Sequence, residues 1–242
     1  MRRYLLILLC LMAAVTAAEA RRYLVCVGIA DYPGQENDLK LSAQDAQTIR
    51  ALYEKNGDAT TELFTDANAT RANVVEAVER LFARADSTDQ VIFFFSGHGM
   101  QGCFVCHDGL LTYNTLLDAM AKSSAGTKIV MADACFAGKM RATKRKKSPE
   151  SSVSDREVMF FLSSRSDEKS IERRHDWRNS LFTGWVERGL RGGADDDRDR
   201  TITAIELFRF VSKGVAETSQ QKQHPVMWGK FRDDMPLMVW KK

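Results

Sequence analysis

Two side chains that can do nucleophilic chemistry follow two apolar runs of the sequence. His98 comes shortly after residues 91–95, and Cys135 comes shortly after residues 128–131. Apolar runs of this length are typical of strands that are buried on both faces of a parallel sheet. Parallel neighbours end at the same edge of a sheet, where open α/β sheets build their sites. We therefore expect the imidazole and the thiol to meet, as a cysteine nucleophile with a histidine base.

The segments around these runs alternate between strand and helix patterns. We expect strands at residues 23–30, 61–64, 91–95, 128–131 and 157–162, a closing strand at 237–240, and helices at 38–55, 71–85, 112–121, 180–190 and 203–216. Such alternation implies right-handed crossovers and a sheet covered by helices. The length suits one α/β domain with a sizeable core, spanning residues 21–242.

The first twenty residues have the layout of a secretory signal peptide. Arg2 and Arg3 form a basic start, residues 5–15 are apolar, and residues 18–20 offer a small-x-small cleavage site. The apolar run is shorter than the roughly 20 residues that a membrane span needs. We expect a mature chain that begins at Arg21, has no membrane span and is exported to the periplasm or the exterior.

The charge composition of the mature chain excludes no class of binding partner. Without Arg2, Arg3 and Glu19 it has 33 basic and 31 acidic residues, which argues neither for nor against nucleic acid. We expect a monomer whose partner is a polypeptide and not a nucleic acid. Its cysteines, at positions 26, 103, 106 and 135, are too few for a disulfide-stapled scaffold, although export implies an oxidising compartment.

Around His98 and Cys135 the sequence resembles the caspase-like cysteine peptidases of family C14, most of all the metacaspases and their bacterial relatives. The resemblance rests on Ser-Gly-His-Gly at 96–99 and Asp-Ala-Cys-Phe-Ala-Gly at 133–138, in that order, and it covers nearly the whole mature chain. It implies a three-layer sandwich around a mostly parallel, six-stranded sheet. It also implies an oxyanion hole made of the backbone N–H groups of Gly99 and Cys135. Asp133 stands where the caspase signature has Gln, which argues against cleavage after aspartate.

Two acidic residues indicate what the site would recognise. Asp133 precedes Cys135 by two residues, so in a strand both side chains share a face. Asp45 falls on the apolar stripe of helix 38–55, where an unpaired carboxylate is costly. The resemblance assigns Asp45, Asp133, Ser96 and Ser42 to a pocket for a basic P1 side chain, which carboxylates would hold by charge-assisted hydrogen bonds. The alternative is that Asp45 is a solvated acid at the helix start and Asp133 caps a turn.

The segment at residues 139–154 interrupts the alternation and predicts an exposed loop. Its first part is basic, with Lys139, Arg141, Lys144, Arg145, Lys146 and Lys147. If the pocket accepts Lys or Arg, residues 139–147 are a target for self-cleavage. The alternative is a solvated run of charge.

An acidic loop near the C-terminus fits the EF-hand calcium pattern. Its oxygen ligands would come from Asp195, Asp197, Asp199, Thr201 and Glu206. Arg200 departs from the pattern, because the sharp turn at this position normally requires Gly. The Arg200 side chain also adds a positive charge beside the ion. The alternative is a helix start in which Thr203 is the N-cap and Glu206 closes a capping box. Cysteine chemistry itself needs no cofactor, and Ca²⁺ is an additional ion that this loop could bind. Metacaspases often depend on calcium at a different acidic site, whose expected acid is missing from residues 139–143.

A Cys-x-x-Cys-His motif at residues 103–107 matches the attachment site of c-type haem. It falls between two elements of the family pattern, where we expect a short hairpin, and no axial ligand is evident. A Cys103–Cys106 disulfide or two free thiols is the favoured interpretation.

A catalytically silent binding module on the same fold is an alternative function for the whole chain, although both catalytic residues are present. The sequence thus predicts an exported cysteine endopeptidase that cleaves after Lys or Arg.

Overall fold

The computed structural model describes residues 20–56, 59–135, 158–165, 168, 170–171 and 178–240. The expected leader, except for Ala20, and the basic segment at 139–147 lie outside the described residues. Among the residues that are described, no helix is both long and apolar enough to cross a bilayer.

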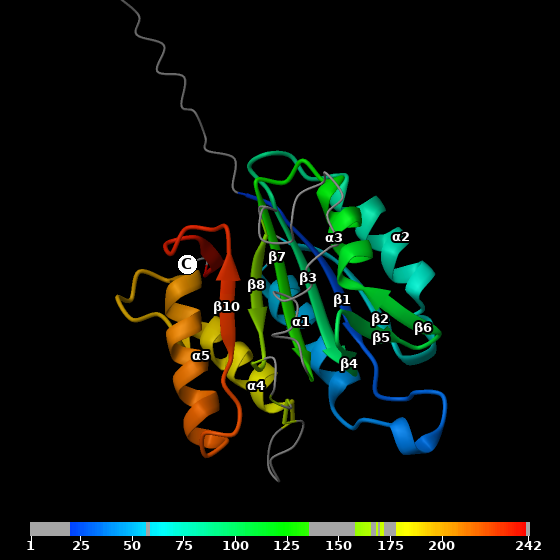
Figure 1. Cartoon of the computed structure of the whole chain (residues 1–242). Coiled ribbons are helices and arrows are strands. Elements are labelled where there is room, and N and C mark those ends of the chain that lie inside the picture. Colours follow the sequence, from blue (N-terminus) through cyan, green and yellow to red (C-terminus); the bar gives the residue numbers. More distant parts are fainter. Residues whose placement is uncertain are drawn as a thin grey trace, which may run out of the picture.

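A six-stranded sheet forms the middle layer of the molecule (Figure 1). Its strand order is β10-β8-β7-β3-β1-β2, and all neighbours are parallel except β10, which runs antiparallel to β8. The strands are β1 (Arg22–Gly28), β2 (Ala59–Thr65), β3 (Gln90–Gly97), β7 (Thr127–Ala134), β8 (Met159–Leu162) and β10 (Val226–Gly229). β1, β3 and β8 are buried along their whole length, as their continuous apolar runs predict.

Helices cover both faces of this sheet (Figure 1). α1 (Ser42–Asn56), α4 (Leu181–Arg188) and α5 (Ala204–Thr218) share one hydrophobic core, and α2 (Arg71–Phe82) and α3 (Tyr113–Ala121) share the other. Side chains of β3 alternate between the two cores: Phe93 and Phe95 enter the α2/α3 core, and Ile92 and Phe94 enter the α1/α4/α5 core. The three-layer sandwich predicted from the sequence is therefore confirmed.

Short elements complete the fold. Two 3₁₀ turns lie at Gln35–Asn37 and Asp66–Asn68, and a π-helical turn at Gly189–Gly193 follows α4. The expected hairpin after His98 is a small antiparallel sheet of three strands, β4 (Gly99–Met100), β5 (Cys103–Cys106) and β6 (Gly109–Thr112). This small sheet begins one residue after His98, so it is positioned by the same strand end.

The closing strand of the large sheet is not the one that the sequence predicts. The apolar run near 237–240 is β11 (Pro236–Val239), which pairs with β9 (Thr201–Thr203) in a separate two-stranded sheet. The sixth strand of the large sheet is instead β10. As an edge strand β10 is only partly buried, so it lacks the continuous apolar run that marks the inner strands.

Candidate active site

His98 and Cys135 leave neighbouring strands at matching positions. β3 and β7 are parallel and pair Gly97 with Ala134, so the next residue of each strand lies at the same edge of the sheet. The backbones come close there, because a Cβ on Gly99 would lie only 2.3 Å from the carbonyl oxygen of Cys135. Only glycine fits this position without a shift. Cys135 is partly exposed and carries a free thiol.

The imidazole of His98 is oriented by a backbone carbonyl. Its Nε2 atom lies 2.6 Å from the carbonyl oxygen of Asn37, at the end of the first 3₁₀ turn. A carbonyl oxygen can only accept, so Nε2 carries the proton and Nδ1 is the basic nitrogen. Asn37 was missed by the sequence analysis because it acts through its main chain, and a main-chain acceptor leaves no signal in residue type.

Tyr32 supports the same histidine from the side. Its ring centroid lies 4.7 Å from that of His98, and its hydroxyl oxygen accepts a hydrogen bond from the His98 backbone N–H at 2.9 Å. The hydroxyl group then donates to the carbonyl oxygen of Val105 on β5 at 3.0 Å. Tyr32 thus ties the end of β3 to the small sheet. Its only signal in the sequence is a tyrosine just beyond the first predicted strand.

Asp45 is buried completely and accepts four hydrogen bonds. Its Oδ1 accepts from Asn179 Nδ2 and from the Ser180 backbone N–H, both at 2.9 Å. Its Oδ2 accepts from the hydroxyl groups of Ser96 at 2.8 Å and Ser180 at 2.6 Å. The alternative of a solvated acid is therefore wrong. Gly28 brings Asp45 to the strand end, because a Cβ at Gly28 would lie 2.3 Å from the carbonyl oxygen of Ser42, so α1 rests directly on β1.

Asp133 lies within β7, 4 % exposed, and is held in a similar way. Its Oδ2 accepts from the backbone N–H of Thr183 at 3.1 Å and from the Thr183 hydroxyl group at 2.8 Å, and its Oδ1 accepts from the Ser170 hydroxyl group. The alternative, that Asp133 caps a turn, does not describe a residue that lies within a strand. Asp133 is also the cross-strand partner of Ser96, which places it beside the Asp45 cluster.

The charge state of these acids follows from their burial. Burial, and then the neighbouring Asp133 carboxylate, raise the pKa of Asp45 to about 7. Burial likewise raises the pKa of Asp133. The first turn of α4 opposes this effect, since the N–H groups of Ser180 and Thr183 point at the two carboxylates from the positive end of the helix.

The structure thus gathers the predicted P1 residues at one place. Ser96 donates to Asp45 and lies opposite Asp133 on the neighbouring strand, and Ser42 is buried at the start of the same helix as Asp45. Sequence reasoning missed the donors that surround them, namely Ser170, Asn179, Ser180 and Thr183. The polar residues before an apolar helix were their only signal, and that signal is equally typical of an ordinary helix start.

The Cys-x-x-Cys motif is neither a disulfide nor a haem site. Both cysteines lie on β5, where an extended chain puts residues three apart about 10 Å from one another. A disulfide needs Cα atoms within roughly 7 Å. The two side chains also point to opposite faces of the strand, so they cannot bond to one side of a porphyrin. Both are buried free thiols, and burial raises the pKa of Cys106 to about 12.

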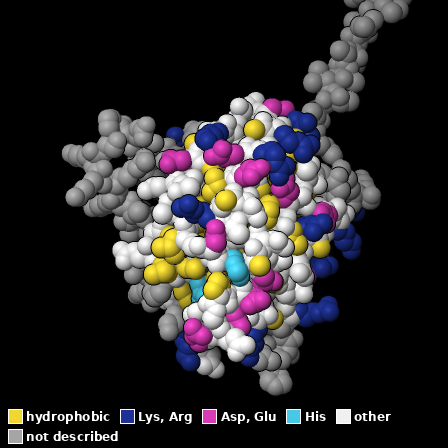
Figure 2. Space-filling view, turned by 90° about the vertical axis from the view of Figure 1, so that its right-hand side faces the viewer, with side chains coloured by type: hydrophobic (Ala, Val, Ile, Leu, Met, Phe, Trp, Pro, Cys, Tyr) yellow, Lys and Arg dark blue, Asp and Glu magenta, His cyan; other side chains and the backbone are white. Residues whose placement is uncertain are grey.

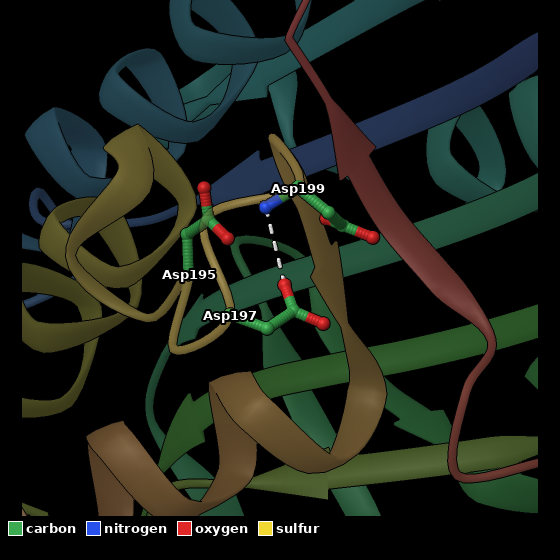
Figure 3. Close-up of side chains that lie close together, drawn as sticks. All are labelled: Asp195, Asp197 and Asp199. Atoms are coloured by element: carbon green, nitrogen blue, oxygen red, sulfur yellow. Dashed lines mark hydrogen bonds between the residues drawn. The ribbon is translucent and has the colours of Figure 1, made fainter.

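The acidic loop adopts a turn that an ion could use. Figure 3 shows Asp195, Asp197 and Asp199 side by side, with one carboxylate oxygen of each within 4.8 Å of the others. Arg200 takes a left-handed conformation (φ 72°), as the pattern requires of its glycine, and its N–H donates to Asp195 Oδ2 at 3.1 Å. The other oxygen, Asp195 Oδ1, is buried without a hydrogen-bond partner. The donor set therefore fits a hard cation.

Glu206 has a different role in this structure. Its Oε2 accepts from the backbone N–H and the hydroxyl group of Thr203, and the Thr203 hydroxyl oxygen accepts from the Glu206 N–H. This is the capping box at the start of α5 that the sequence offered as an alternative. The backbone N–H of Thr201 donates to Asp199 Oδ1 at 2.6 Å. The other Glu206 oxygen, Oε1, accepts from the backbone N–H of Asp196 at 3.2 Å, so Glu206 also ties the start of α5 to the acidic loop.

Comparison with known proteins assigns the chain to a family. The model of the caspase domain, peptidase family C14, matches residues 21–236. The chain belongs to the caspase-domain family. No curated protein sequence matches this caspase-domain protein significantly.

Solved structures agree with the assignment at the level of the fold. Caspase-1 from Spodoptera frugiperda has a TM-score of 0.65 at 14 % identity, covering 93 % of this chain and 91 % of its own. A pro-Sf-caspase-1 structure has a TM-score of 0.65 at 16 % sequence identity, and the match covers 93 % of this chain and 92 % of that one. Protein GSU0716 from Geobacter sulfurreducens has a TM-score of 0.66 at 14 % sequence identity, and the match covers 91 % of this chain and 100 % of that one. At these identities the likeness concerns the fold alone.

Proposed function

We propose that this caspase-domain protein is a cysteine endopeptidase that cleaves polypeptides after Lys or Arg. One observation carries the proposal: an accessible thiol, an oriented imidazole and two buried carboxylates all lie at one edge of the sheet. The thiol and the imidazole supply a nucleophile and a proton carrier. The carboxylates supply the negative charge that would select a basic side chain.

The nucleophile in this proposal is the thiolate of Cys135. Its Sγ attacks the carbonyl carbon of the scissile peptide bond, and the carbonyl electrons move to the oxygen. Backbone N–H groups of Gly99 and Cys135 stabilise this oxyanion, and the tight contact at Gly99 keeps the two backbones together. The C–N bond then breaks and leaves a thioester on Cys135.

His98 handles the protons. Because Asn37 holds the proton on Nε2, the imidazole exchanges protons with the reacting groups through Nδ1. The Cys135 thiol first transfers its proton to Nδ1, which leaves the thiolate and an imidazolium. The imidazolium then protonates the leaving amine through Nδ1 as the C–N bond breaks. In the second half of the reaction the imidazole takes a proton from the water that attacks the thioester, and the thiolate of Cys135 leaves.

A basic P1 side chain would reach Asp45 and Asp133 only after the surrounding side chains rearrange. Asp45 and Asp133 accept from the hydroxyl groups of Ser180 and Ser170, and both acids lie beneath protein atoms. A guanidinium or ammonium group must therefore take over hydrogen bonds that these serines now donate. Exchange of neutral donors for charged ones favours the ionised acids, which offsets the burial that raises their pKa.

Three further proposals extend this activity. First, the enzyme cleaves its own chain within residues 139–147, where six basic side chains follow the nucleophile. Second, residues 1–20 direct export, so the enzyme acts in the periplasm or the exterior. It acts there as a monomer.

Third, the 195–206 loop binds Ca²⁺, which the buried, unpartnered Asp195 Oδ1 supports. Bound Ca²⁺ would stabilise the loop between α4 and α5 and takes no part in the bond cleavage.

The proposal is tested with peptides that carry Arg, Lys or Asp at P1. We expect wild type to cleave the Arg and Lys peptides at least about 100-fold faster than the Asp peptide, since the pocket holds two acids. Cys135→Ala should remove this cleavage. Absence of turnover by the folded mature protein would favour the silent binding module instead.

A further inference from the structure

A hollow of about 440 Å³ lies beside His98, on the side of the sheet away from the two acids. Tyr32, His98, Met100, Val105 and Cys106 are among its lining residues. Tyr32, Val105 and Cys106 belong to or pack against the α2/α3 core, whereas α1, which carries Asp45, packs in the other core. The hollow and the acids therefore flank the strand ends from opposite faces of the sheet.

The small sheet β4-β5-β6 extends this hollow with an apolar surface. Cross-strand pairing sets Met100 opposite Cys103 and Leu110 opposite Val105. Side chains alternate along a strand, so Met100, Val105 and Leu110 share the outer face while Phe104 and Leu111 are buried beneath it. Met100 is 53 % exposed and Leu110 is 47 % exposed. Figure 2 shows hydrophobic side chains next to histidine side chains on one face of the molecule.

The direction of a bound substrate follows from these positions and rests on the proposed function. The P1 side chain enters toward Asp45 and Asp133, on the α1/α4 side. The leaving amine must reach His98, which protonates it, and His98 packs against Tyr32 on the opposite side. The chain beyond the cleaved bond must then pass His98 and continue over the hollow and the small sheet.

We propose that this hollow, together with Leu110 on the adjoining face of the small sheet, is the subsite for an apolar residue directly C-terminal to the cleaved bond. Met100 lines the hollow, and Leu110 is the cross-strand partner of Val105, which also lines it. The site is continuous with the catalytic centre, since His98 and Gly99 line it. Met100 and Leu110 determine specificity here and do not touch the reacting atoms. Apolar side chains with about half their surface exposed on one continuous face gain favourable contacts when a substrate side chain covers them.

The test compares two peptides that share the same sequence up to Arg at P1 and carry Leu or Gly at the next position. A peptidyl-arginine methyl ester, whose leaving group is methanol, reports catalysis without any residue beyond the bond. We expect wild type to prefer Leu over Gly by about tenfold in kcat/KM. Met100→Ser and Leu110→Ser should each reduce that preference at least threefold and leave ester hydrolysis within twofold of wild type.

Val239→Ser is the matched control, because Val239 is an apolar side chain of similar exposure (39 %) on β11. It should preserve the preference for Leu. Equal rates for the two peptides, together with normal ester hydrolysis, would overturn the subsite and leave the proposed function intact. A folded wild type that hydrolyses neither peptide nor ester would overturn the proposed function and the subsite with it.

Discussion

Ser180 donates two hydrogen bonds to Asp45, from its backbone N–H to Oδ1 at 2.9 Å and from its hydroxyl group to Oδ2 at 2.6 Å. The two carboxylate oxygens differ in their partners. Oδ1 accepts only from N–H groups, which cannot become acceptors, whereas Oδ2 accepts only from the hydroxyl groups of Ser96 and Ser180. Hydroxyl groups can turn and accept instead. An amide in place of the Asp45 carboxylate could therefore keep the same hydrogen-bond partners, and only the negative charge would be lost.

Asp45→Asn should fold well and lose recognition of basic side chains. Its Nδ2 can replace Oδ2 and donate to the two serines, so every partner of Asp45 is kept. Because a buried charge disappears, we expect the free energy of unfolding at pH 8 to be equal or about 1 kcal/mol higher. Cleavage after Arg should fall about 100-fold in kcat/KM because the charge-assisted contact is lost. Urea unfolding and peptide kinetics measure both quantities.

Asp31→Asn is the control for this change, since Asp31 is an exposed acid outside the pocket. It should alter neither stability nor kcat/KM. A stable Asp45→Asn protein that cleaves after Arg as fast as wild type would refute the role of Asp45 in recognition.

The stability of the substrate-free protein should fall as the pH rises from 5 to 8. The folded-state pKa of Asp45 is raised to about 7, above the ordinary value of 3.8. A raised folded-state pKa means that the contribution of this group is complete below about pH 4 and is lost as the pH rises through 7. We expect wild type to lose about 2 kcal/mol over this range relative to Asp45→Asn. Parallel pH profiles of the two proteins in urea unfolding would show that the carboxyl group titrates normally.

Calcium should stabilise the protein through the Asp195–Asp199 cluster. Ca²⁺ at about 100 times its Kd adds roughly 2.7 kcal/mol, or about 5 °C in Tm for a chain of this size. The gain comes from coordination of Asp195 Oδ1 and from relief of repulsion among the three acids. Differential scanning calorimetry with Ca²⁺, and with Mg²⁺ for comparison, measures it. The double change Asp195→Asn and Asp197→Asn should remove the shift, and an equal shift in that variant would place the ion elsewhere.

Self-cleavage should appear in the intact mass of the purified chain. If the pocket accepts Lys or Arg, wild type gives two fragments whose masses place the cut after a basic residue within 139–147. The Cys135→Ala protein, incubated alongside, should keep its full mass. Wild type that stays unclipped, or a Cys135→Ala protein that is clipped equally, would exclude self-processing in this loop.

The sequence predicts the inner part of this fold far better than its edges. Phe93, Phe94 and Phe95 mark β3 because both faces of that strand are buried, and the same holds for β8. β10 escapes prediction because it is short, partly buried and ends at Gly229, so its residues carry no continuous apolar signal. The other edge strand, β2, is also partly buried, yet it was predicted at residues 61–64. The run at 237–240 was assigned to the large sheet because hydrophobicity predicts burial and says nothing of which strand is the partner.

In the candidate site, too, residues marked by a local sequence pattern were predicted, and residues brought in by tertiary contacts were not. His98, Cys135, Asp45 and Asp133 follow from residue type and from their place on a strand end or a helix stripe. Asn37 acts through its carbonyl group, and Ser180 reaches Asp45 across 135 positions, so neither role could be foreseen. Glu206 fits two patterns equally in sequence, and only the folded loop shows that it closes the capping box.

Covalent labelling tests the central claim most directly. A peptide that ends in an arginine chloromethyl ketone places an electrophile where the scissile carbonyl would lie. The account predicts one equivalent of label, located on Cys135 by peptide mass mapping, and much slower labelling when aspartate replaces arginine or when Asp45 is changed to Asn. Label on Cys103, Cys106 or no cysteine at all, or equal labelling by the arginine and aspartate reagents, would contradict it.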